Sequence, residues 1–313
     1  MSNVPSRSAT VTSLPAASPA DVLERLERAL LGKREQLVLA LACLLARGHL
    51  LIEDVPGVGK TTLARALGGT FGLAWTRVQF TSDLLPADIV GVSVFDAASG
   101  RFEFREGPVF TSMLLADEIN RAPPKAQSAL LEAMEERQVS VDGVTRALGE
   151  DFFVIATQNP VDQLGAYPLP ESQLDRFLVG IELGYPDPAS ERELLERGDR
   201  RAAIDTLAPC ASGADIARWA EHVEALHVAA PVFDYVQALL SVTRESGTTG
   251  LSPRAGLALV RLCRAHAFLA ERDHVLPEDV REVFPALAGH RLTGRVSAGR
   301  AAALEVLDRV PMP

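Results

Sequence analysis

The sequence predicts an α/β fold in which a parallel sheet is followed by a smaller, all-helical region. Three short runs, at 49–52, 113–116 and 152–156, are almost continuously apolar, which is typical of parallel strands buried on both faces. Segments with helical spacing separate these runs, as the crossovers of a parallel sheet require. From residue 187 onward the pattern is helical only. We therefore expect a disordered tail at 1–19, an α/β domain at 20–185 and a helical domain at 186–313.

Composition narrows the class of protein. The chain has 313 residues, 47% of them hydrophobic, which is enough for two domains with sizeable cores. No apolar run approaches the roughly 18 residues of a membrane span, and the Ser-, Ala- and Pro-rich N-terminus lacks the apolar stretch of a signal peptide. We therefore expect a cytoplasmic protein without a membrane span. A net charge of −10 argues against nucleic acid as a partner.

The cysteines give no sign of a disulfide or a metal site. Cys43, Cys210 and Cys263 are scattered, and the first and last lie within apolar helical patterns. We expect them to be small core residues in a reducing compartment.

The first half of the chain predicts helices and strands in alternation. Leucines at helical spacing predict two helices between about 19 and 49, broken near Gly32, before the first buried strand at 49–52. A strand is expected at 75–81, followed by a hairpin of 92–95 and 101–104 around the turn 96–100. That hairpin is either an edge decoration or a surface that touches a substrate or partner.

A helix and a second hairpin precede the last buried strand. The helix runs from Pro124 to about Arg137, and we expect its glutamates, Glu132, Glu135 and Glu136, to be solvated without a chemical role. Strands at 139–141 and 144–146 flank the Asp142–Gly143 turn, a strong hairpin signal.

The second half of the chain predicts six helices. Asp187 and Ser252 are natural N-caps for the first and fourth of them, and prolines occupy first helical turns. The expected helices lie near 188–200, 213–228, 231–245, 253–272, 277–288 and 298–310.

The segment between the first strand and the next helix predicts a phosphate-binding loop. A glycine-rich turn between a strand and a helix, ending in Lys-Thr, offers backbone N–H groups to phosphate oxygens at a helix N-terminus. Asp54 stands where the usual pattern has glycine, so we expect the loop to close but to hold its first residue differently. Lys60 would reach the β- and γ-phosphates and Thr61 would ligate Mg²⁺. The expected nucleotide-binding residues are Asp54, Pro56, Gly57, Val58, Gly59, Lys60, Thr61 and Thr62.

Two other strand ends supply residues for the same ligand. Ligands of open α/β sheets bind beyond the carboxyl ends of the strands, where Asp117, Glu118 and Asn159 are expected. Hydrolysis of a γ-phosphate needs neutralised charge and an oriented water. Asp117 fits as the Mg²⁺ partner beside Thr61, and Glu118 as the residue that orients or deprotonates the water. Residues 31–33, at the break between the first two helices, could wall the adenine or form an ordinary corner.

Five motifs in order resemble the MoxR family of AAA+ ATPases. They are LLIEDVPGVGKT at 50–61, LADEINRAPPK at 115–125, ATQNP at 156–160, LDRF at 174–177 and SPRA at 252–255, and the resemblance covers nearly all of the chain after residue 20. It implies a P-loop NTPase domain of AAA+ type followed by a helical lid. The resemblance also accounts for Asp54, because aspartate is common at this position in the family.

The resemblance also implies roles for individual residues. Asn159 matches the first sensor of the γ-phosphate, and Arg176 matches an arginine finger that acts on the neighbouring subunit's ATP. Arg254 matches the second sensor, which reaches the γ-phosphate of its own subunit. The two hairpins match insertions that place the family near magnesium-chelatase motor subunits and minichromosome maintenance helicases.

The sequence therefore predicts an ATP hydrolase that needs Mg²⁺, forms a ring, expected to be a hexamer, and remodels or matures client proteins. The resemblance implies partners with a von Willebrand factor A domain. A metal-chelatase motor subunit, a nucleic-acid translocase and a slowly hydrolysing, nucleotide-gated assembly switch are the alternatives.

Overall fold

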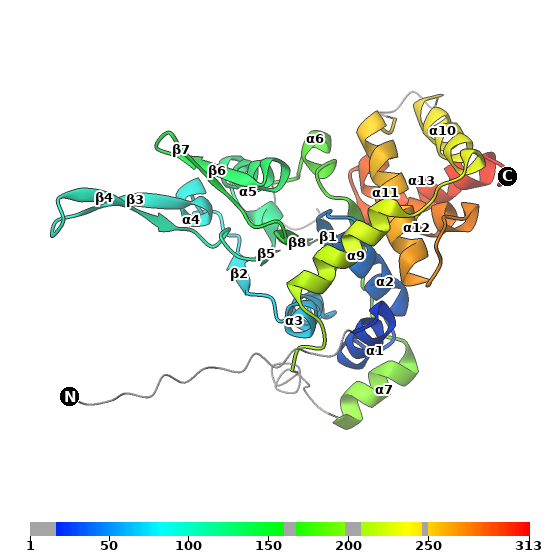
Figure 1. The fold of residues 1–313 in the computed structure, drawn as a ribbon, viewed down its shortest axis with the longest axis horizontal. Coiled ribbons are helices and arrows are strands. Elements are labelled where there is room, and N and C mark those ends of the chain that lie inside the picture. Colours follow the sequence, from blue (N-terminus) through cyan, green and yellow to red (C-terminus); the bar gives the residue numbers. More distant parts are fainter. Residues whose placement is uncertain (1–16, 160–166, 198–207, 246–249) are drawn as a thin grey trace.

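The computed structural model describes residues 17–159, 167–197, 208–245 and 250–313. The expected tail, apart from its last residues, lies outside this part of the chain, as do Pro160 and the end of the helix expected at 188–200. The described chain forms a sheet domain with two projecting hairpins and a cluster of helices on the other side (Figure 1).

A five-stranded parallel sheet is the centre of the fold, as predicted. Its strands lie in the order β2-β5-β8-β1-β9, and every neighbouring pair is parallel. The strands are β1 (Leu50–Glu53), β2 (Trp75–Gln79), β5 (Met113–Asp117), β8 (Phe153–Gln158) and β9 (Val179–Ile181). This order brings the carboxyl ends of β1, β5 and β8 to one edge.

Successive side chains of a strand point to opposite faces of the sheet, so an apolar run gives apolar residues to both faces. Leu50 and Ile52 face one core, and Leu51 faces the other. The first core is formed with α1 (Pro19–Ala29), α2 (Arg34–Leu45), α3 (Lys60–Phe71) and the C-terminal helices. The second is formed with α4 (Pro86–Val90) and α5 (Pro124–Glu136). This two-sided burial explains why β1, β5 and β8 read as continuous apolar runs.

Strand β9 and the short helices α4 and α6 (Glu171–Leu174) were not predicted from the sequence. Strand β9 has three residues with glycine at its centre, which is a weak strand signal. A Cβ on Gly180 would lie 2.7 Å from His290 Nδ1, so glycine allows the C-terminal helices to pack closely on this strand.

Two antiparallel hairpins project from the sheet domain, away from the helices at 230–309 (Figure 1). They are β3 (Gly91–Asp96) with β4 (Arg101–Glu106), and β6 (Gln138–Val141) with β7 (Val144–Ala147). Asp142 and Gly143 both have positive φ, as the predicted tight turn requires. The Arg146 guanidinium lies 3.7 Å from the centre of the Phe104 ring, so the two hairpins support each other.

The C-terminal region is helical, as predicted. Asp187 accepts hydrogen bonds from the backbone of Ala189 and Ser190, and Ser252 Oγ accepts one from Ala255 N at 3.1 Å, so both expected N-caps are confirmed. Helices α9 and α11 pack on α2, so this region shares a continuous core with the sheet domain. The helices are α7 (Pro188–Arg197), α9 (Gly213–Ala225), α10 (Ala230–Glu245), α11 (Pro253–Leu269), α12 (Pro277–Thr293) and α13 (Val296–Arg309).

Cys43 and Cys263 are buried core residues, Cys210 is half-buried, and all three are free thiols. Within the described ranges, no helix is both long and apolar enough to cross a membrane.

Candidate functional site

The loop from β1 to α3 has the geometry that the glycine-rich sequence predicts. Gly57 and Gly59 have φ values of 90° and 106°, a region that side chains other than glycine rarely adopt. A Cβ at Gly57 would meet nothing within 4 Å, so the loop leaves open space at its tip. Gly59 precedes the first turn of α3, whose free N–H groups point out of the helix start. The loop is therefore shaped to receive an anion.

Asp54 explains how the loop closes without glycine at its first position. Its carboxylate accepts hydrogen bonds from Val55 N at 2.8 Å and from Gly184 N at 2.6 Å. The side chain thus ties the loop to the segment after β9. Its backbone carbonyl accepts a 2.6 Å hydrogen bond from Lys60 Nζ.

Lys60 is the buried cation of the site. Its Nζ also donates to Asn159 Oδ1 at 3.3 Å. Burial lowers the pKa of Lys60, and the nearby charges of Asp54, Asp117 and Glu118 oppose this shift. A partly desolvated ammonium at the mouth of an anion-binding loop is well placed to attract phosphate.

Asp117 is held at the end of β5 by neighbours on both sides. Thr157 Oγ donates to Asp117 Oδ1 at 2.5 Å, and Arg77 contacts Asp117 Oδ2 through Nη2 at 2.6 Å and Nε at 3.1 Å. The Thr157 hydroxyl also accepts a hydrogen bond from Glu118 N at 2.9 Å. One threonine on β8 therefore fixes the carboxylate of Asp117 and the backbone of Glu118.

Glu118 has a left-handed backbone, with φ 57° and ψ 47°. This conformation costs a non-glycine residue of order 1 kcal/mol and is concentrated at functional sites. It turns the chain sharply from β5 into the short 3₁₀ helix η1 (Ile119–Arg121). The Glu118 carboxylate accepts from Asn159 Nδ2 at 3.0 Å and Gln79 Nε2 at 2.9 Å, and pairs with Arg121 at 3.0 Å.

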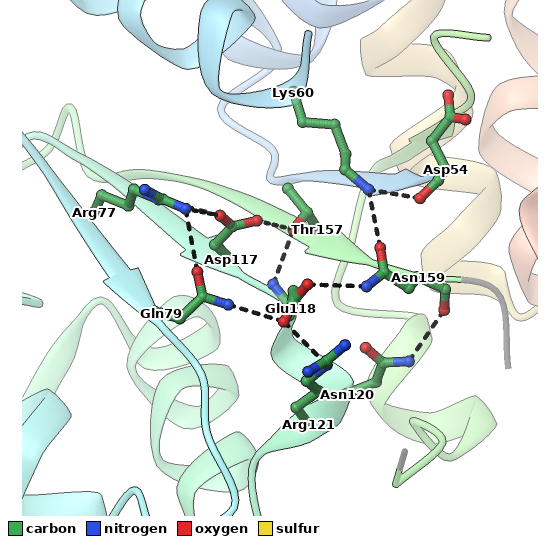
Figure 2. Close-up of polar contacts among 10 residues, drawn as sticks. All are labelled: Asp54, Lys60, Arg77, Gln79, Asp117, Glu118, Asn120, Arg121, Thr157 and Asn159. Carbon is green, nitrogen blue, oxygen red and sulfur yellow. Dashed lines mark hydrogen bonds and ion pairs between the residues drawn. The ribbon is translucent and has the colours of Figure 1, made fainter. Parts of the chain in front are cut away.

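Asn159 connects the cation to the acid. Its amide oxygen faces Lys60 and its amide nitrogen faces Glu118 (Figure 2). Asn120 donates to the Asn159 backbone carbonyl at 3.1 Å and holds the end of β8 in place.

These groups line one pocket of about 390 Å³ at the carboxyl edge of the sheet. The residues around it are Pro56, Gly57, Gly59, Lys60, Thr61, Thr62, Arg65, Arg77, Gln79, Asp117, Glu118 and Asn159. The structure thus brings together most of the predicted nucleotide-binding residues. Val58 lies behind them in the core, packed with the apolar side chains of the first cluster.

Sequence reasoning missed Thr157, Arg77, Gln79 and Asn120. Arg77 and Gln79 are two residues apart on β2, so they share a face, and Gln79 is in register with Asp117. The sequence does show that Arg77 and Gln79 alternate with other residues on a predicted strand. It does not show that this strand, β2, pairs with β5 and so lies beside Asp117.

Arg176 and Arg254 lie together elsewhere, on the carboxylate of Glu135. Arg176 Nη2 is 3.0 Å from Glu135 Oε2, and Arg254 Nη1 is 2.8 Å from Glu135 Oε1. Glu135 is exposed, as expected, but it is also paired, because the fold brings two arginines to it from distant parts of the chain.

This arginine pair is at the far edge of the sheet from Lys60. Met134, beside Glu135, accepts from His49 Nε2 at 3.2 Å, and His49 precedes the amino end of β1. Helix α5 carries the chain about 17 Å from Pro124 to Glu135. The placement of Arg254 differs from the expectation that it reaches the phosphate of its own subunit.

The residues near the break at 31–33 form a packed corner. Gly32 has a φ of 67°, and a Cβ there would lie 2.5 Å from Asp187 Oδ2. Lys33 Nζ donates to the Tyr185 carbonyl at 2.6 Å.

The donor set fits a nucleotide with Mg²⁺. Over the described ranges, no group of three or more His, Cys, Asp or Glu side chains could hold a metal ion. The described residues therefore offer no site in which such side chains alone would bind a metal. Mg²⁺ needs no such cage, since it is commonly bound by one or two protein oxygens, phosphate oxygens and water. The Asp117 carboxylate, at the end of β5, and the Thr61 hydroxyl, in the first turn of α3, would supply the protein oxygens.

Comparisons with known proteins agree with this geometry. The family model described as "ATPase family associated with various cellular activities (AAA)" matches residues 49–179, and an AAA lid domain matches residues 240–309. A crystal structure of a Cytophaga hutchinsonii protein described as an ATPase superposes with a TM-score of 0.81 at 34% identity, covering 94% of each chain.

Curated relatives match over most of their length. The chain is 45% identical over 272 residues to the uncharacterized protein YeaC of Bacillus subtilis, covering 86% of this chain and 85% of that protein. It is 41% identical over 299 residues to Chaperone MoxR1 of Mycobacterium tuberculosis, covering 88% and 77%. It is 32% identical to Protein MoxR of Methylorubrum extorquens, covering 87% and 88%. With its phosphate loop, parallel sheet and helical C-terminal region, this chain belongs to the MoxR family of AAA+ ATPases.

Proposed function

We propose that this protein binds ATP with Mg²⁺, hydrolyses the β–γ phosphoanhydride bond, and uses the reaction in a ring, with six subunits, to remodel or mature client proteins. The observation that carries the proposal is the bridge made by Asn159. Its one amide contacts Lys60, the phosphate-binding cation, and Glu118, the proposed catalytic acid. A γ-phosphate bound at Lys60 would therefore lie beside a carboxylate able to orient water.

Binding is assigned to the loop and the start of α3. The N–H groups from Gly57 to Thr62 and the Lys60 ammonium would hold the phosphates, and Asp54 keeps the loop closed. Thr61 and Asp117 would hold Mg²⁺, which, when bound, neutralises charge on the phosphate oxygens. Thr157 and Arg77 orient Asp117 for this task.

Glu118 is assigned to the attacking water. Its carboxylate is fixed by Gln79, Arg121 and Asn159, so it would accept a proton from, or orient, a water without rearranging. Asn159 would change its contacts when the γ-phosphate is present, because it also touches Lys60. This matches the role of a first sensor.

Arg176 is assigned to the ATP of a neighbouring subunit. It lies at the opposite edge of the sheet from Lys60, so a second subunit is needed to bring the two together. We assign Arg254 to the same boundary because it shares Glu135 with Arg176. Ring assembly supplies such a boundary at every subunit.

Client remodelling rests on the relatives. One is named a chaperone, and the projecting hairpins offer surface beyond the nucleotide pocket. We propose clients or partners with a von Willebrand factor A domain.

Two substitutions test the site. Glu118→Gln keeps the shape of the side chain but removes the base, so ATP binding should stay near the parent value while turnover falls by roughly 10²–10⁴. Lys60→Ala removes the phosphate cation and should weaken nucleotide binding itself. Binding of a fluorescent ATP analogue and steady-state phosphate release measure both. A parent chain that binds ATP without turnover would favour the assembly switch, and a Glu118→Gln protein with parent turnover would refute the catalytic assignment.

Proteins captured by the Glu118→Gln variant in the presence of ATP would separate the remaining alternatives. A chelatase subunit would be recovered with metal-insertion partners, and a translocase with nucleic acid.

A further inference from the structure

We infer that Glu135 is a positioning residue that aims Arg176 across the subunit boundary, with Arg254 bound to the other oxygen of the same carboxylate. The inference rests on the proposed function, because Arg176 is useful only if ATP is hydrolysed at that boundary. It deepens that function by assigning a role to a glutamate outside the nucleotide pocket.

The backbone that carries Arg176 is fixed without Glu135. Arg291 of α12 is buried and spans the segment on either side of Arg176. Its guanidinium contacts Asp175 Oδ1 at 2.7 Å, the Phe177 carbonyl at 2.7 Å and the Leu178 carbonyl at 3.2 Å. Removing the charge of Glu135 should therefore leave this segment in place.

The direction of the Arg176 side chain is set separately, on α5. Arg176 Nη1 donates to the Leu131 carbonyl at 2.6 Å, and Nη2 pairs with Glu135 Oε2 at 3.0 Å. The Arg176 and Glu135 side chains are 28% and 29% exposed, so the pair is partly shielded from water. An arginine has several rotatable bonds, and two acceptors on one rigid helix leave it few other arrangements.

Arg254 fixes the glutamate in turn. It approaches Glu135 Oε1 from α11, at 2.8 Å, so each carboxylate oxygen has one guanidinium partner. Two guanidinium groups this close would repel each other without a negative charge between them. Glu135 thus permits the two arginines to lie side by side, facing the same boundary.

The helix also links this carboxylate to the reaction. Helix α5 begins six residues after Glu118 and ends one residue after Glu135, at Glu136. One helix therefore connects the turn that follows the proposed catalytic acid to the glutamate that holds the arginine presented to the neighbour.

The test compares Glu135→Gln, Glu135→Asp and the control Glu132→Gln in the full chain. Glu132 is exposed, lies one turn earlier on α5, and pairs with no arginine of the described residues. Glu135→Gln should lower kcat about 10- to 100-fold, the scale of a misplaced reacting group, while KM and ATP binding stay within about threefold of the parent. Glu135→Asp keeps the charge and should retain intermediate activity. Glu132→Gln should behave like the parent.

Mixed assemblies distinguish positioning from loss of structure. Glu135→Gln subunits mixed with Lys60→Ala subunits should regain activity, because Lys60→Ala subunits carry an intact arginine pair and Glu135→Gln subunits an intact pocket. Glu135→Gln mixed with Arg176→Ala should stay slow, because neither subunit presents a positioned Arg176.

Parent-like kcat for Glu135→Gln, with Arg176→Ala slow, overturns the inference and leaves the proposed function intact. The inference is also overturned if Glu135→Gln fails to recover activity in the Lys60→Ala mixture and has, in addition, lost ATP binding or melts at a lower temperature. Glu135 would then be structural. If the parent chain does not turn over ATP, the proposed function fails and the inference falls with it.

Discussion

Thr157 holds the two acids of the site in one arrangement. Its hydroxyl is fully buried, donates to Asp117 and accepts from the backbone of Glu118. Such partners fix a ligand's direction, and losing one typically costs about 10–100-fold in metal affinity or activity.

Replacing Thr157 with valine should impair both the site and the fold. Valine keeps the shape but leaves the Glu118 N–H and one Asp117 oxygen without this partner. We expect a loss of about 1–3 kcal/mol in the free energy of unfolding. We also expect a higher Mg²⁺ requirement for ATP turnover, measured by Mg²⁺ titration of the steady-state rate. Thr157→Ser retains the hydroxyl and should stay close to the parent. A valine variant with unchanged Mg²⁺ dependence would contradict the proposed role.

His49 makes stability depend on pH. Val154 N donates to His49 Nδ1 at 3.1 Å, and His49 Nε2 donates to the Met134 carbonyl at 3.2 Å. The ring is therefore neutral in the fold, and burial lowers its pKa from 6.5 to about 4.

Because the unfolded chain binds this proton first, the stabilisation from His49 is complete above pH 6.5 and is lost as the pH falls to about 4. The loss is about 3 kcal/mol. Urea unfolding at pH 7.5, 5.5 and 4.5 measures it. His49→Leu should be less stable at pH 7.5 but show a shallower fall on acidification, whereas the exposed His222→Leu should keep the parent slope. A parent slope in His49→Leu would show that other groups dominate.

Among the elements, the β3–β4 hairpin is packed near its base and carries exposed aromatic side chains nearer its turn. Phe104 packs on Phe110 and under Arg146 of the second hairpin. Further out, Phe95 and Phe102 contact each other edge-on, yet they are 56% and 73% exposed. Exposed aromatic side chains on a supported projection are typical of interaction surfaces.

Replacing Phe95 and Phe102 with serine should separate client binding from hydrolysis. Basal ATP turnover should stay within about twofold, because these residues lie outside the pocket, and recovery of clients by a Glu118→Gln trap should fall at least about tenfold, as expected for hot-spot residues. Phe233→Ser on α10, at a side chain that is 46% exposed, is the matched control. A loss of nucleotide binding in the double variant would instead make the hairpin structural.

In the molecule as a whole, the pocket and the arginine pair lie at opposite edges of the same sheet. A subunit therefore carries both halves of the proposed site but cannot join them within itself. In the proposed ring, repetition of the same contact would join each pocket to the next subunit's arginines.

ATP turnover should consequently depend on assembly. Specific activity should rise with protein concentration until the ring is complete, since an arginine finger is worth about 10³–10⁵ in rate. Arg176→Ala should bind ATP normally and remain slow at every concentration. Mixing it with Lys60→Ala should restore part of the activity, because some boundaries then join an intact pocket to an intact Arg176. If co-assembled variants recover nothing, Arg176 does not act in trans.

The helical region is also joined to the sheet by buried polar contacts. Glu53, at the end of β1, accepts from Val296 N at the start of α13 at 2.7 Å and from Gln158 Nε2 at 3.1 Å. Together with Arg291, this contact makes the helices part of the frame that holds both the phosphate loop and Arg176.

The features that are local along the chain could be predicted from the sequence. The phosphate loop, the acid pair at the end of β5 and the N-caps at Asp187 and Ser252 each depend on residues within a few positions of one another. Their backbone geometry follows from glycine, from apolar runs and from side chains that bond the nearest turn. The parallel sheet could be predicted because three of its strands, β1, β5 and β8, are buried on both faces and therefore read as apolar runs.

Which distant side chains meet depends on how the elements pack in the folded chain. Thr157 and Asp117 are 40 positions apart, and Arg254 and Glu135 are 119 apart. Nothing local marks Glu135 as different from Glu132, because both lie on the polar side of one helix. Strand pairing and the packing of α11 and α12 on the sheet domain select the partners, and they also set Arg254 beside Arg176 and away from its own phosphate loop. Such contacts form only in the folded chain, so the local pattern of residues does not predict them.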